Sequence, residues 1–377
     1  MAVLGVSSIT PAFPDIIEHF HLQPEQVGWL ITIFTLPGIF LTPVLGILAD
    51  RVGRKKILVP SLFLFGFAGT GCALTGSYEM LLLLRFFQGI GAASLGSLNV
   101  TLIGDLFQGK ERVRVMGLNA SVLSIGTASY PTIGGLLATI GWNYPFLLPS
   151  IAFLVGFWVI LKLDNPEPKK GQAFKEYIAT AFAYIFKKDV LILFFMSFFT
   201  FILLYGAYLT FFPLLLKQNF NFHAGSIGLT MSLASASTAI TSANLKKIRH
   251  FLTEKQCVML AFLFYSLSML LLYLAKDLSL VYIGIIFFGI GHGINFPVIQ
   301  VLLTSAVPLE YRAAFMSMNG TILRMGQSAG PMVMGLIFAI MGGLGSVFAA
   351  GSILAILIAM AFRLLFNSDA MKNNAAA

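Results

Sequence analysis

Charged residues are concentrated in one short stretch, GILADRVGRKK, at residues 46–56. Its eleven positions hold one acid, four bases and two glycines, although only 10% of the whole chain is charged. An acid and a base so placed can form ion pairs with each other or with the ends of helices. Gly46 and Gly53 permit a tight turn and a close approach of two helices. The stretch is a candidate for a reversible ionic contact.

Residues for covalent or metal-assisted catalysis are not indicated. The sequence contains no HExxH motif and no His-rich cluster, so it offers no obvious metal ligands. It also lacks the GxxxxGK[ST] motif that binds nucleoside triphosphates. We predict that the protein is not an enzyme, that it needs no cofactor or metal, and that any work it does draws on an ion gradient or a solute gradient.

The composition is that of a membrane protein. The chain is 58% hydrophobic and 10% charged, whereas a soluble domain is about 25% charged. At roughly 20 apolar residues per span, we expect twelve transmembrane helices, near residues 1–17, 28–49, 57–77, 80–106, 113–140, 145–163, 190–214, 225–245, 257–275, 279–306, 313–341 and 345–366. The first is short, but it lacks the basic leader and cleavage site of a signal peptide. We therefore interpret it as a span.

Basic residues lie almost entirely on one side of this predicted topology. With both termini in the cytoplasm, the outward loops contain only Lys217 and Lys276, and the other loop bases face inward. This asymmetry follows the positive-inside rule. We predict a multi-pass protein of the cell membrane with both termini cytoplasmic. The net charge of +9 is explained by this topology, so it does not indicate a nucleic-acid partner.

The two halves of the chain are related to each other. Residues 87–140 align with residues 287–340 without a gap, and the matches include paired Gly, Pro, Arg and Asn residues. We predict an all-α membrane protein of twelve transmembrane helices in two pseudo-symmetric six-helix bundles. The predicted parts are a first bundle at 1–163, a cytoplasmic linker at 164–189, a second bundle at 190–366 and a cytoplasmic tail at 367–377. The linker could lie along the membrane or be a solvated tether.

The stretch at residues 46–56 resembles the loop signature of the major facilitator superfamily, G-x-L-A-D-R-x-G-R-[KR]-[KR]. It falls between the second and third predicted spans, where that family carries it, and the resemblance covers the whole chain. The resemblance implies a latch that holds an outward-open state and breaks when the inner gate opens. The residues of this predicted latch are Gly46, Asp50, Arg51, Gly53, Arg54 and Asp105. The alternative is a basic loop that only sets the topology.

Two further spans resemble signatures of the same family. In the fourth, LLLLRFFQGIGAA matches at Arg85 and Gln88, and the resemblance implies a part in proton coupling; a purely structural arginine is the alternative. The fifth resembles the antiporter signature G-x8-G-x3-G-P-x2-G-G of the twelve-span drug:proton antiporter branch, with tyrosine in place of one glycine. Its matching positions are Gly117, Gly126, Tyr130, Pro131, Gly134 and Gly135.

Polar residues at membrane depth are candidates for contact with substrate or protons, because a charge there is costly and usually functional. Arg324 lies about 16 Å from the inner surface at 1.5 Å per residue, and Gln327 follows one turn later. His292 and Asn295 lie at similar depth in the tenth span, and Tyr205 and Tyr208 could line a cavity in the seventh.

Acids are missing at the same depth. Exporters of lipophilic cations commonly carry a carboxylate in the first span, where this chain has Gly5. The deep arginine and the missing acid predict neutral or anionic amphipathic substrates.

These patterns predict a proton-coupled secondary transporter that exports amphipathic small molecules by alternating access. Uptake of a metabolite or flipping of a lipid by the same fold is the alternative, favoured by Tyr130 and by the absent acid in the first span. The expected partners are the small-molecule substrate, protons and the lipid bilayer, and we expect a monomer. Cys72 and Cys257 lie in separate halves, so no structural disulfide is expected.

Overall fold

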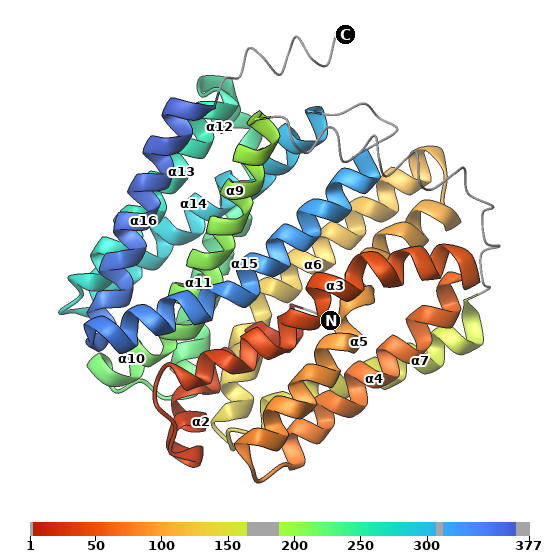
Figure 1. Cartoon of the computed structure of the whole chain (residues 1–377), viewed down its shortest axis with the longest axis horizontal. Coiled ribbons are helices and arrows are strands. Elements are labelled where there is room, and N and C mark those ends of the chain that lie inside the picture. Colours follow the sequence, from red (N-terminus) through yellow and green to blue (C-terminus); the bar gives the residue numbers. More distant parts are fainter. Residues whose placement is uncertain (1–2, 164–187, 307–311, 367–377) are drawn as a thin grey trace.

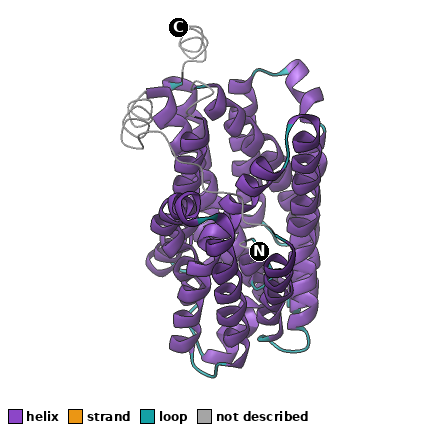
Figure 2. Cartoon of the chain, turned by 90° about the vertical axis from the view of Figure 1, so that its right-hand side faces the viewer, coloured by secondary structure: helices purple, strands orange, loops and turns teal. Residues whose placement is uncertain are grey.

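The protein is built from α-helices. A computed structural model describes residues 3–163, 188–306 and 312–366, and no strand occurs within them (Figures 1 and 2). Nearly all of the predicted linker, and the whole of the predicted tail, lie outside the described residues. Their boundaries therefore stay predictions.

The first half of the chain begins with a broken helix and continues with five long segments. These elements are α1 (Leu4–Ser7), η1 (Thr10–Ala12), α2 (Phe13–Phe20), η2 (Gln26–Gly28), α3 (Trp29–Val52), α4 (Arg54–Leu74), α5 (Tyr78–Leu106), α6 (Gly109–Ala138), η3 (Tyr144–Ser150) and α7 (Ile151–Lys162). Pro11 and Pro14 fall in the broken first helix, because proline removes a backbone donor and disfavours an uninterrupted helix.

The second half repeats this order. Its elements are α9 (Lys188–Ile202), the π-helical η4 (Leu203–Phe211), α10 (Phe212–Phe220), α11 (Ala224–Ala243), α12 (Leu245–Phe251), α13 (Glu254–Tyr273), α14 (Leu278–Ser305), α15 (Arg312–Met341) and α16 (Gly343–Leu365). The helices of each half pack mainly on one another, so the fold is two helical bundles side by side (Figure 1).

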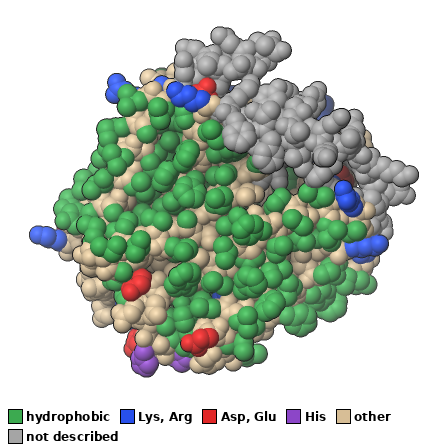
Figure 3. Space-filling model, viewed as in Figure 1, with side chains coloured by type: hydrophobic (Ala, Val, Ile, Leu, Met, Phe, Trp, Pro, Cys, Tyr) green, Lys and Arg blue, Asp and Glu red, His purple; other side chains and the backbone are tan. Residues whose placement is uncertain are grey.

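Within the residues that the structure describes, eight helical segments are long and apolar enough to cross a membrane. Four further segments complete the chain order that twelve spans require: the broken first helix precedes the eight, and α6, α11 and α15 lie between them. The last three are rich in Gly, Ser and Thr, which lower the hydropathy but allow helices to approach closely. Hydrophobic side chains cover most of the face shown in Figure 3, and charged side chains lie near its rim.

The two bundles meet along two helix pairs, which we call the α3–α15 seam and the α6–α11 seam. In the first, a Cβ added to Gly28 would lie 2.9 Å from the Cβ of Pro331. In the second, a Cβ on Gly228 would overlap the Pro131 carbonyl. Gly28 and Gly228 are 200 positions apart in the sequence, and so are Pro131 and Pro331. The two seams are therefore the same contact made twice by the repeat.

Hydrogen bonds in the two seams share one related member, Thr32 and Ser232, although their partners Ser328 and Thr132 are 196 positions apart. Thr32 Oγ1 donates to Ser328 O at 2.9 Å in the α3–α15 seam. In the α6–α11 seam, Thr132 Oγ1 donates to Ser232 Oγ at 2.7 Å. Thr32 and Ser232 are again 200 positions apart. Each seam thus joins a glycine contact to a hydrogen bond one turn away.

The space between the bundles opens toward the end that carries residues 46–56. At the opposite end α2 packs against α10. At the residue 46–56 end, by contrast, a Cβ built on Gly46 of α3 or Gly117 of α6 would meet nothing within 4 Å among the described residues, whereas Gly38 and Gly135 of the same two helices meet the other bundle. The bundles therefore meet at one end and through the seams, and they diverge at the other end.

Helix α6 depends on two adjacent glycines that face different neighbours. A Cβ on Gly134 would overlap the carbonyl of Ser8 in the first helix and lie 2.7 Å from its Cα. A Cβ on Gly135 would overlap the carbonyl of Ala224 in α11, across the α6–α11 seam. Gly134 therefore packs within the first bundle, and the next residue, Gly135, packs against the second bundle.

Replacing Gly134 with valine should destabilise the fold. The added side chain has no room against the Ser8 backbone, and overpacking of this kind costs about 1–3 kcal/mol. Thermal unfolding in detergent should show a clearly lowered Tm. Gly117→Ala in the same helix is the matched control, because its Cβ enters open space and alanine favours a helix by up to about 1 kcal/mol over glycine. Equal Tm values for the two variants would contradict the packing described here.

Candidate transport path and gate

An ion pair joins two helices of the first bundle at the residue 46–56 end. Arg54 begins α4 and pairs through Nε with Asp105 Oδ2 near the end of α5, and both side chains are about six-sevenths buried, at 14% and 16% exposure. Gly53 has a φ of 100°, a value that favours glycine at the turn between α3 and α4. Lys55 Nζ donates to Ile160 O in α7 at 2.7 Å. The stretch therefore ties together the ends of α4, α5 and α7.

The remaining predicted latch residues differ in their surroundings. Arg51 is exposed, and Gly46 has open space where a Cβ would be. The side chain of Asp50 lies outside the described part. The resemblance implies a latch that breaks when this end opens, yet the Arg54–Asp105 pair is formed while the bundles are apart here. This pair is a fixed part of the first bundle in this state.

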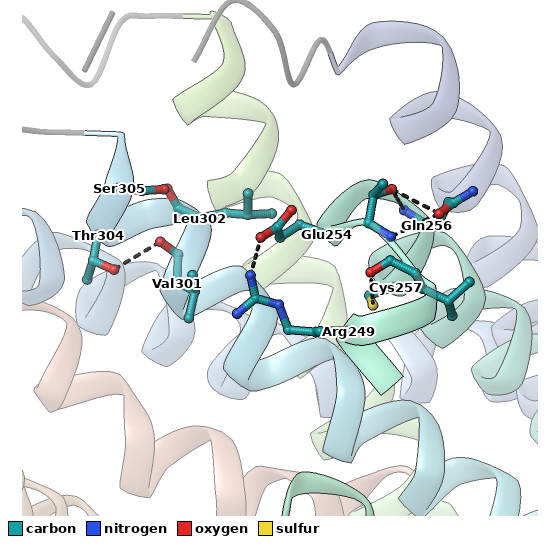
Figure 4. A network of polar contacts seen from close by, with 10 residues as sticks. Arg249, Glu254, Gln256, Cys257, Val301, Leu302, Thr304 and Ser305 are labelled. Carbon is teal, nitrogen blue, oxygen red and sulfur yellow. Dashed lines mark hydrogen bonds and ion pairs between the residues drawn. The ribbon is translucent and has the colours of Figure 1, made fainter. Parts of the chain in front are cut away.

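The corresponding end of the second bundle is held differently (Figure 4). Glu254 and Ser305 stand 200 positions after Arg54 and Asp105. Ser305 Oγ donates within its own helix to Leu302 O at 3.0 Å, and Glu254 pairs with Arg249 across the short turn between α12 and α13. The pairing is therefore local in sequence here, whereas it joins two separate helices in the first bundle.

Arg85 is fully buried inside the first bundle. Its Nε donates to Leu30 O at 3.0 Å, and its Nη1 donates to Gly5 O at 2.8 Å and to Gln88 Oε1 at 2.6 Å. The guanidinium also lies 4.2 Å from the centre of the Phe34 ring. The arginine thus fastens α5 to the first two transmembrane segments through backbone carbonyls, and it does not reach the membrane surface. Its Nη2 and the Nε2 of Gln88 remain buried without a hydrogen-bond partner.

Arg324 of α15 crosses from the second bundle to the first. A Cβ on Gly38 of α3 would lie 2.8 Å from Arg324 Cδ and Cζ, so the arginine stem occupies the space that a side chain at residue 38 would need. Arg324 Nη2 lies 3.5 Å from Ala93 O in α5, and Tyr205 of η4 is a neighbouring polar side chain. Gln327 is partly buried one turn away. Arg324 is therefore a charge held between the bundles.

The two predicted cavity tyrosines are both buried in the π-helical η4. Tyr208 donates to Met231 O at 3.0 Å and stacks on Phe288 with ring centres 4.5 Å apart. Tyr205 stacks on Phe201 at 5.7 Å and lies near Arg324. The expectation that both line an open cavity therefore needs correction: Tyr208 is a packing residue at 4% exposure, because its hydroxyl is satisfied by α11.

His292 and Asn295 lie one turn apart in α14. His292 Nδ1 is 2.9 Å from the Tyr265 hydroxyl of α13, and the imidazole is partly exposed. Asn295 Nδ2 donates to Thr200 Oγ1 of α9 at 2.7 Å, while its Oδ1 is buried without a partner. These residues form a polar cluster between α9, α13 and α14.

The predicted antiporter helix, α6, has two distinct halves. Near its centre, a Cβ on Gly126 would lie 2.5 Å from Tyr130 Oη, so Gly126 accommodates the tyrosine of its own helix and not a neighbouring helix. Toward the open end the helix is exposed, and its hydroxyls bond to its own backbone: Ser121 to Gly117 O at 3.0 Å and Ser124 to Ala120 O at 2.9 Å. The close approaches are confined to the half that contains Pro131, Gly134 and Gly135.

One pentapeptide, GQSAG at residues 326–330, has the spacing of an esterase nucleophile motif. That motif requires its serine on a sharp turn between a strand and a helix. Here Ser328 lies inside α15 and belongs to the α3–α15 seam, where its Oγ lies 3.4 Å from Thr32 O. The serine is a packing residue of the bundle interface.

The whole chain matches one protein family. The family described as the Major Facilitator Superfamily matches residues 1–250 and 216–376. The chain belongs to the Major Facilitator Superfamily. As a member of this superfamily it is a multi-pass membrane transporter of small molecules, and it is not an enzyme.

Relatives within the superfamily include several proteins named for export or resistance. Multidrug resistance protein 1 of Bacillus subtilis is 26% identical over 342 residues, covering 90% of this chain and 87% of that protein. The bacillibactin exporter of the same bacterium is 27% identical over 386 residues, covering 98% and 94%. The class D tetracycline resistance protein of Salmonella ordonez is 24% identical over 89% of this chain and 86% of that protein.

Solved superfamily structures share the fold along the full chain. A bacterial homolog of the human lysosomal transporter Spinster, inward-facing and unoccupied, has a TM-score of 0.78 at 18% identity and covers 100% of this chain and 94% of that one. A variant of the nucleoside transporter NupG has a TM-score of 0.79 at 16% identity, covering 97% and 96%. At these identities the likeness concerns the fold alone.

Several residues that connect the bundles escaped sequence reasoning. Gly28 and Gly228, with Thr32 and Ser232, extend the 200-residue relation beyond the aligned segment, and a search for pairs at that offset would have found them. Gly38 gives no such signal, because one glycine in an apolar helix is unremarkable until the neighbouring side chain is known.

A side chain at residue 38 should displace Arg324. In Gly38→Val the new atoms occupy the space of the arginine stem, so we expect the separation of the bundles to change. Spin labels at Gly76 and Lys276, at the closed end, would report this by pulsed EPR as a longer mean distance. The two native cysteines are buried and should stay unlabelled.

The matched control is Gly46→Ala in the same helix, where a Cβ meets open space. It should leave the distance distribution unchanged. A Gly38→Val distribution identical to that of the wild type would show that Arg324 does not help to hold the bundles together.

Proposed function

We propose that this transporter is a proton-coupled exporter of amphipathic small molecules, which works by alternating access with the residue 46–56 end in the cytoplasm. One observation carries the proposal: the bundles touch through small residues along two seams and at one end only. Small residues at the seams allow two rigid bundles to rock, and the Arg324 side chain, which reaches from α15 into the space beside Gly38, would have to move with them. Relatives named as multidrug resistance proteins and as a bacillibactin exporter support the direction.

Asp50 would be the switching member of the proposed latch. The Arg54–Asp105 pair is already formed with this end open, so its formation cannot distinguish the two states. Asp50 lies in the last turn of α3, and a carboxylate can interact with the positively polarised beginning of another helix. In this proposal Asp50 binds across the gap only when the bundles close at this end.

Arg324 would favour neutral or anionic substrates over cations. Each described carboxylate lies at or near a helix end, and none is buried at the depth of Arg324. A guanidinium remains charged at working pH, and the hydrogen-bond partner seen here is a carbonyl at 3.5 Å. An anionic or carbonyl-bearing amphipath would supply a better partner.

Uptake or flipping of a metabolite or lipid by the same fold is the second candidate. The observation that favours it is Tyr130, which replaces a glycine of the exporter signature and fills the space beside Gly126. Inside-out vesicles with an imposed proton gradient distinguish the two candidates. An exporter accumulates its substrate in them, and an importer does so in right-side-out vesicles.

The latch proposal predicts different effects for two neighbouring acids. Asp50→Asn should slow gradient-driven flux about tenfold, corresponding to 1.4 kcal/mol, with an unchanged Tm. Asp105→Asn should lower the Tm, because Arg54 loses its partner inside the bundle. Flux is measured as uptake of dansylglycine into inside-out vesicles. Glu111→Gln, exposed near the same end, is the control, and wild-type flux in Asp50→Asn would remove that residue from the gate.

The charge proposal predicts selective binding. Wild-type protein should bind dansylglycine, an anion, at least about tenfold more tightly than a dansylated quaternary amine of equal length, a difference of 1.4 kcal/mol. Arg324→Gln should abolish this preference, measured by fluorescence titration in detergent. Arg363→Gln, on the exposed end of α16, should retain it. Equal affinities for the two ligands in the wild type would exclude Arg324 from substrate selection.

A further inference from the structure

Proton coupling requires a group at membrane depth that gains and loses a proton. Arginine cannot do so at working pH, and the described carboxylates lie at or near helix ends. Of the five histidines in the chain, four lie at helix ends or in turns, namely His19, His21, His223 and His250. The fifth, His292, lies near the middle of the 28-residue α14.

The position of His292 is fixed by its surroundings. On either side of it, Gly289 and Gly293 bring α14 against the backbone of α11, where a Cβ on Gly293 would lie 2.6 Å from Thr238 O. The imidazole lies among the rings of Phe201, Phe288 and Phe296, with centres 5.9–6.5 Å away. A ring held in this way cannot turn freely, so its two nitrogens have distinct roles.

Those roles follow from the hydrogen bonds. Nδ1 is 2.9 Å from the Tyr265 hydroxyl. In the tautomer that donates Nδ1–H to this hydroxyl, which the proposal requires, Nε2 has the free lone pair that can bind a transported proton. Asn295 is on the same side of α14, one turn away, and its buried Oδ1 has no donor. An unused acceptor and aromatic ring faces both stabilise a positive charge.

Other titratable groups near His292 are few. Tyr265 comes from α13, and Tyr205 and Tyr208 come from η4, each stacked on a ring that also borders the imidazole. Helix α11 carries no titratable side chain. Arg324 on α15 remains charged, and the acids Asp189 and Glu254 lie at the far ends of α9 and α13. No carboxylate on these helices competes for the proton at this depth.

We propose that His292 binds the transported proton, with Tyr265 as its positioning residue. This inference rests on the proposed function. With no substrate bound, water reaches the partly exposed imidazole and a proton binds at Nε2. An amphipathic substrate whose anionic end pairs with Arg324 places its apolar part against Phe201 and Phe296. The apolar part displaces that water, and loss of water favours the neutral imidazole. The proton leaves Nε2 as the substrate binds, so the two alternate on the carrier.

The test compares two kinds of flux in proteoliposomes, with dansylglycine as the probe. Exchange at equal pH needs substrate binding and rocking only, whereas uphill accumulation also needs a proton. His292→Gln should keep exchange within about twofold and lose accumulation driven by a pH gradient, since coupling and binding are separate free-energy terms. His250→Gln, on the exposed surface of α12, should behave as the wild type.

Proton release on ligand binding and the pH profile of a Tyr265 variant test the proposal in two further ways. In weakly buffered detergent, dansylglycine should release protons from wild-type protein and none from His292→Gln. Tyr265→Phe preserves the ring and removes only the hydroxyl, and it should shift the pH profile of accumulation while exchange persists. An unchanged profile removes Tyr265 from the proposal.

The outcomes separate the two proposals. Wild-type protein that shows no gradient-driven accumulation contradicts the proposed function. Wild-type protein that accumulates the probe, together with a His292→Gln variant that accumulates it equally, overturns the assignment of His292 alone.

Discussion

The arrangement of the two bundles depends on close backbone contact at small residues. Where Gly28 meets Pro331, and Gly228 meets Pro131, one extra carbon atom would collide with the opposite bundle. Helices in lipid gain no hydrophobic stabilisation from association, so they adhere through van der Waals packing and hydrogen bonds. The hydroxyl pairs of Thr32 and Thr132 supply the second contribution. These seam contacts hold the bundles together through small residues, and Arg324 adds one long side chain that crosses between them.

The second constraint is the placement of positive charge inside an apolar medium. An unpaired charge at the centre of a bilayer costs several kcal/mol. Arg85 meets this constraint with two helix carbonyls, a glutamine and an aromatic ring, so it stabilises one bundle. Arg324 has one carbonyl oxygen at 3.5 Å, which is at the distance limit of a hydrogen bond, and a tyrosine nearby. The contrast between a well-bonded and a weakly bonded arginine separates a structural residue from a candidate binding residue.

Much of this architecture could be predicted from the sequence. Apolar runs and the bias of Lys and Arg indicated a multi-pass helical protein, and the 200-residue repeat indicated two bundles. The membrane supplies this predictability, because a chain crossing lipid must satisfy its backbone within helices or closed barrels. Individual partners were not predictable. That Arg85 binds the carbonyl of Gly5, or that Gly126 receives Tyr130, depends on rotamers and helix rotation, which periodicity does not specify.

The exposed half of α6 has a consequence for the energetics of a moving protein. Its serines donate to carbonyls one turn earlier in the same helix, so their hydrogen bonds do not depend on any neighbour. Such a surface can face water, acyl chains or another helix without leaving a donor unsatisfied. In alternating access this helix surface is exposed to water and then covered again once in every transport cycle. Its free energy must therefore be nearly equal in the exposed and the covered state. Hydroxyls that donate to carbonyls of their own helix meet this requirement, because they keep the same hydrogen bonds in both states.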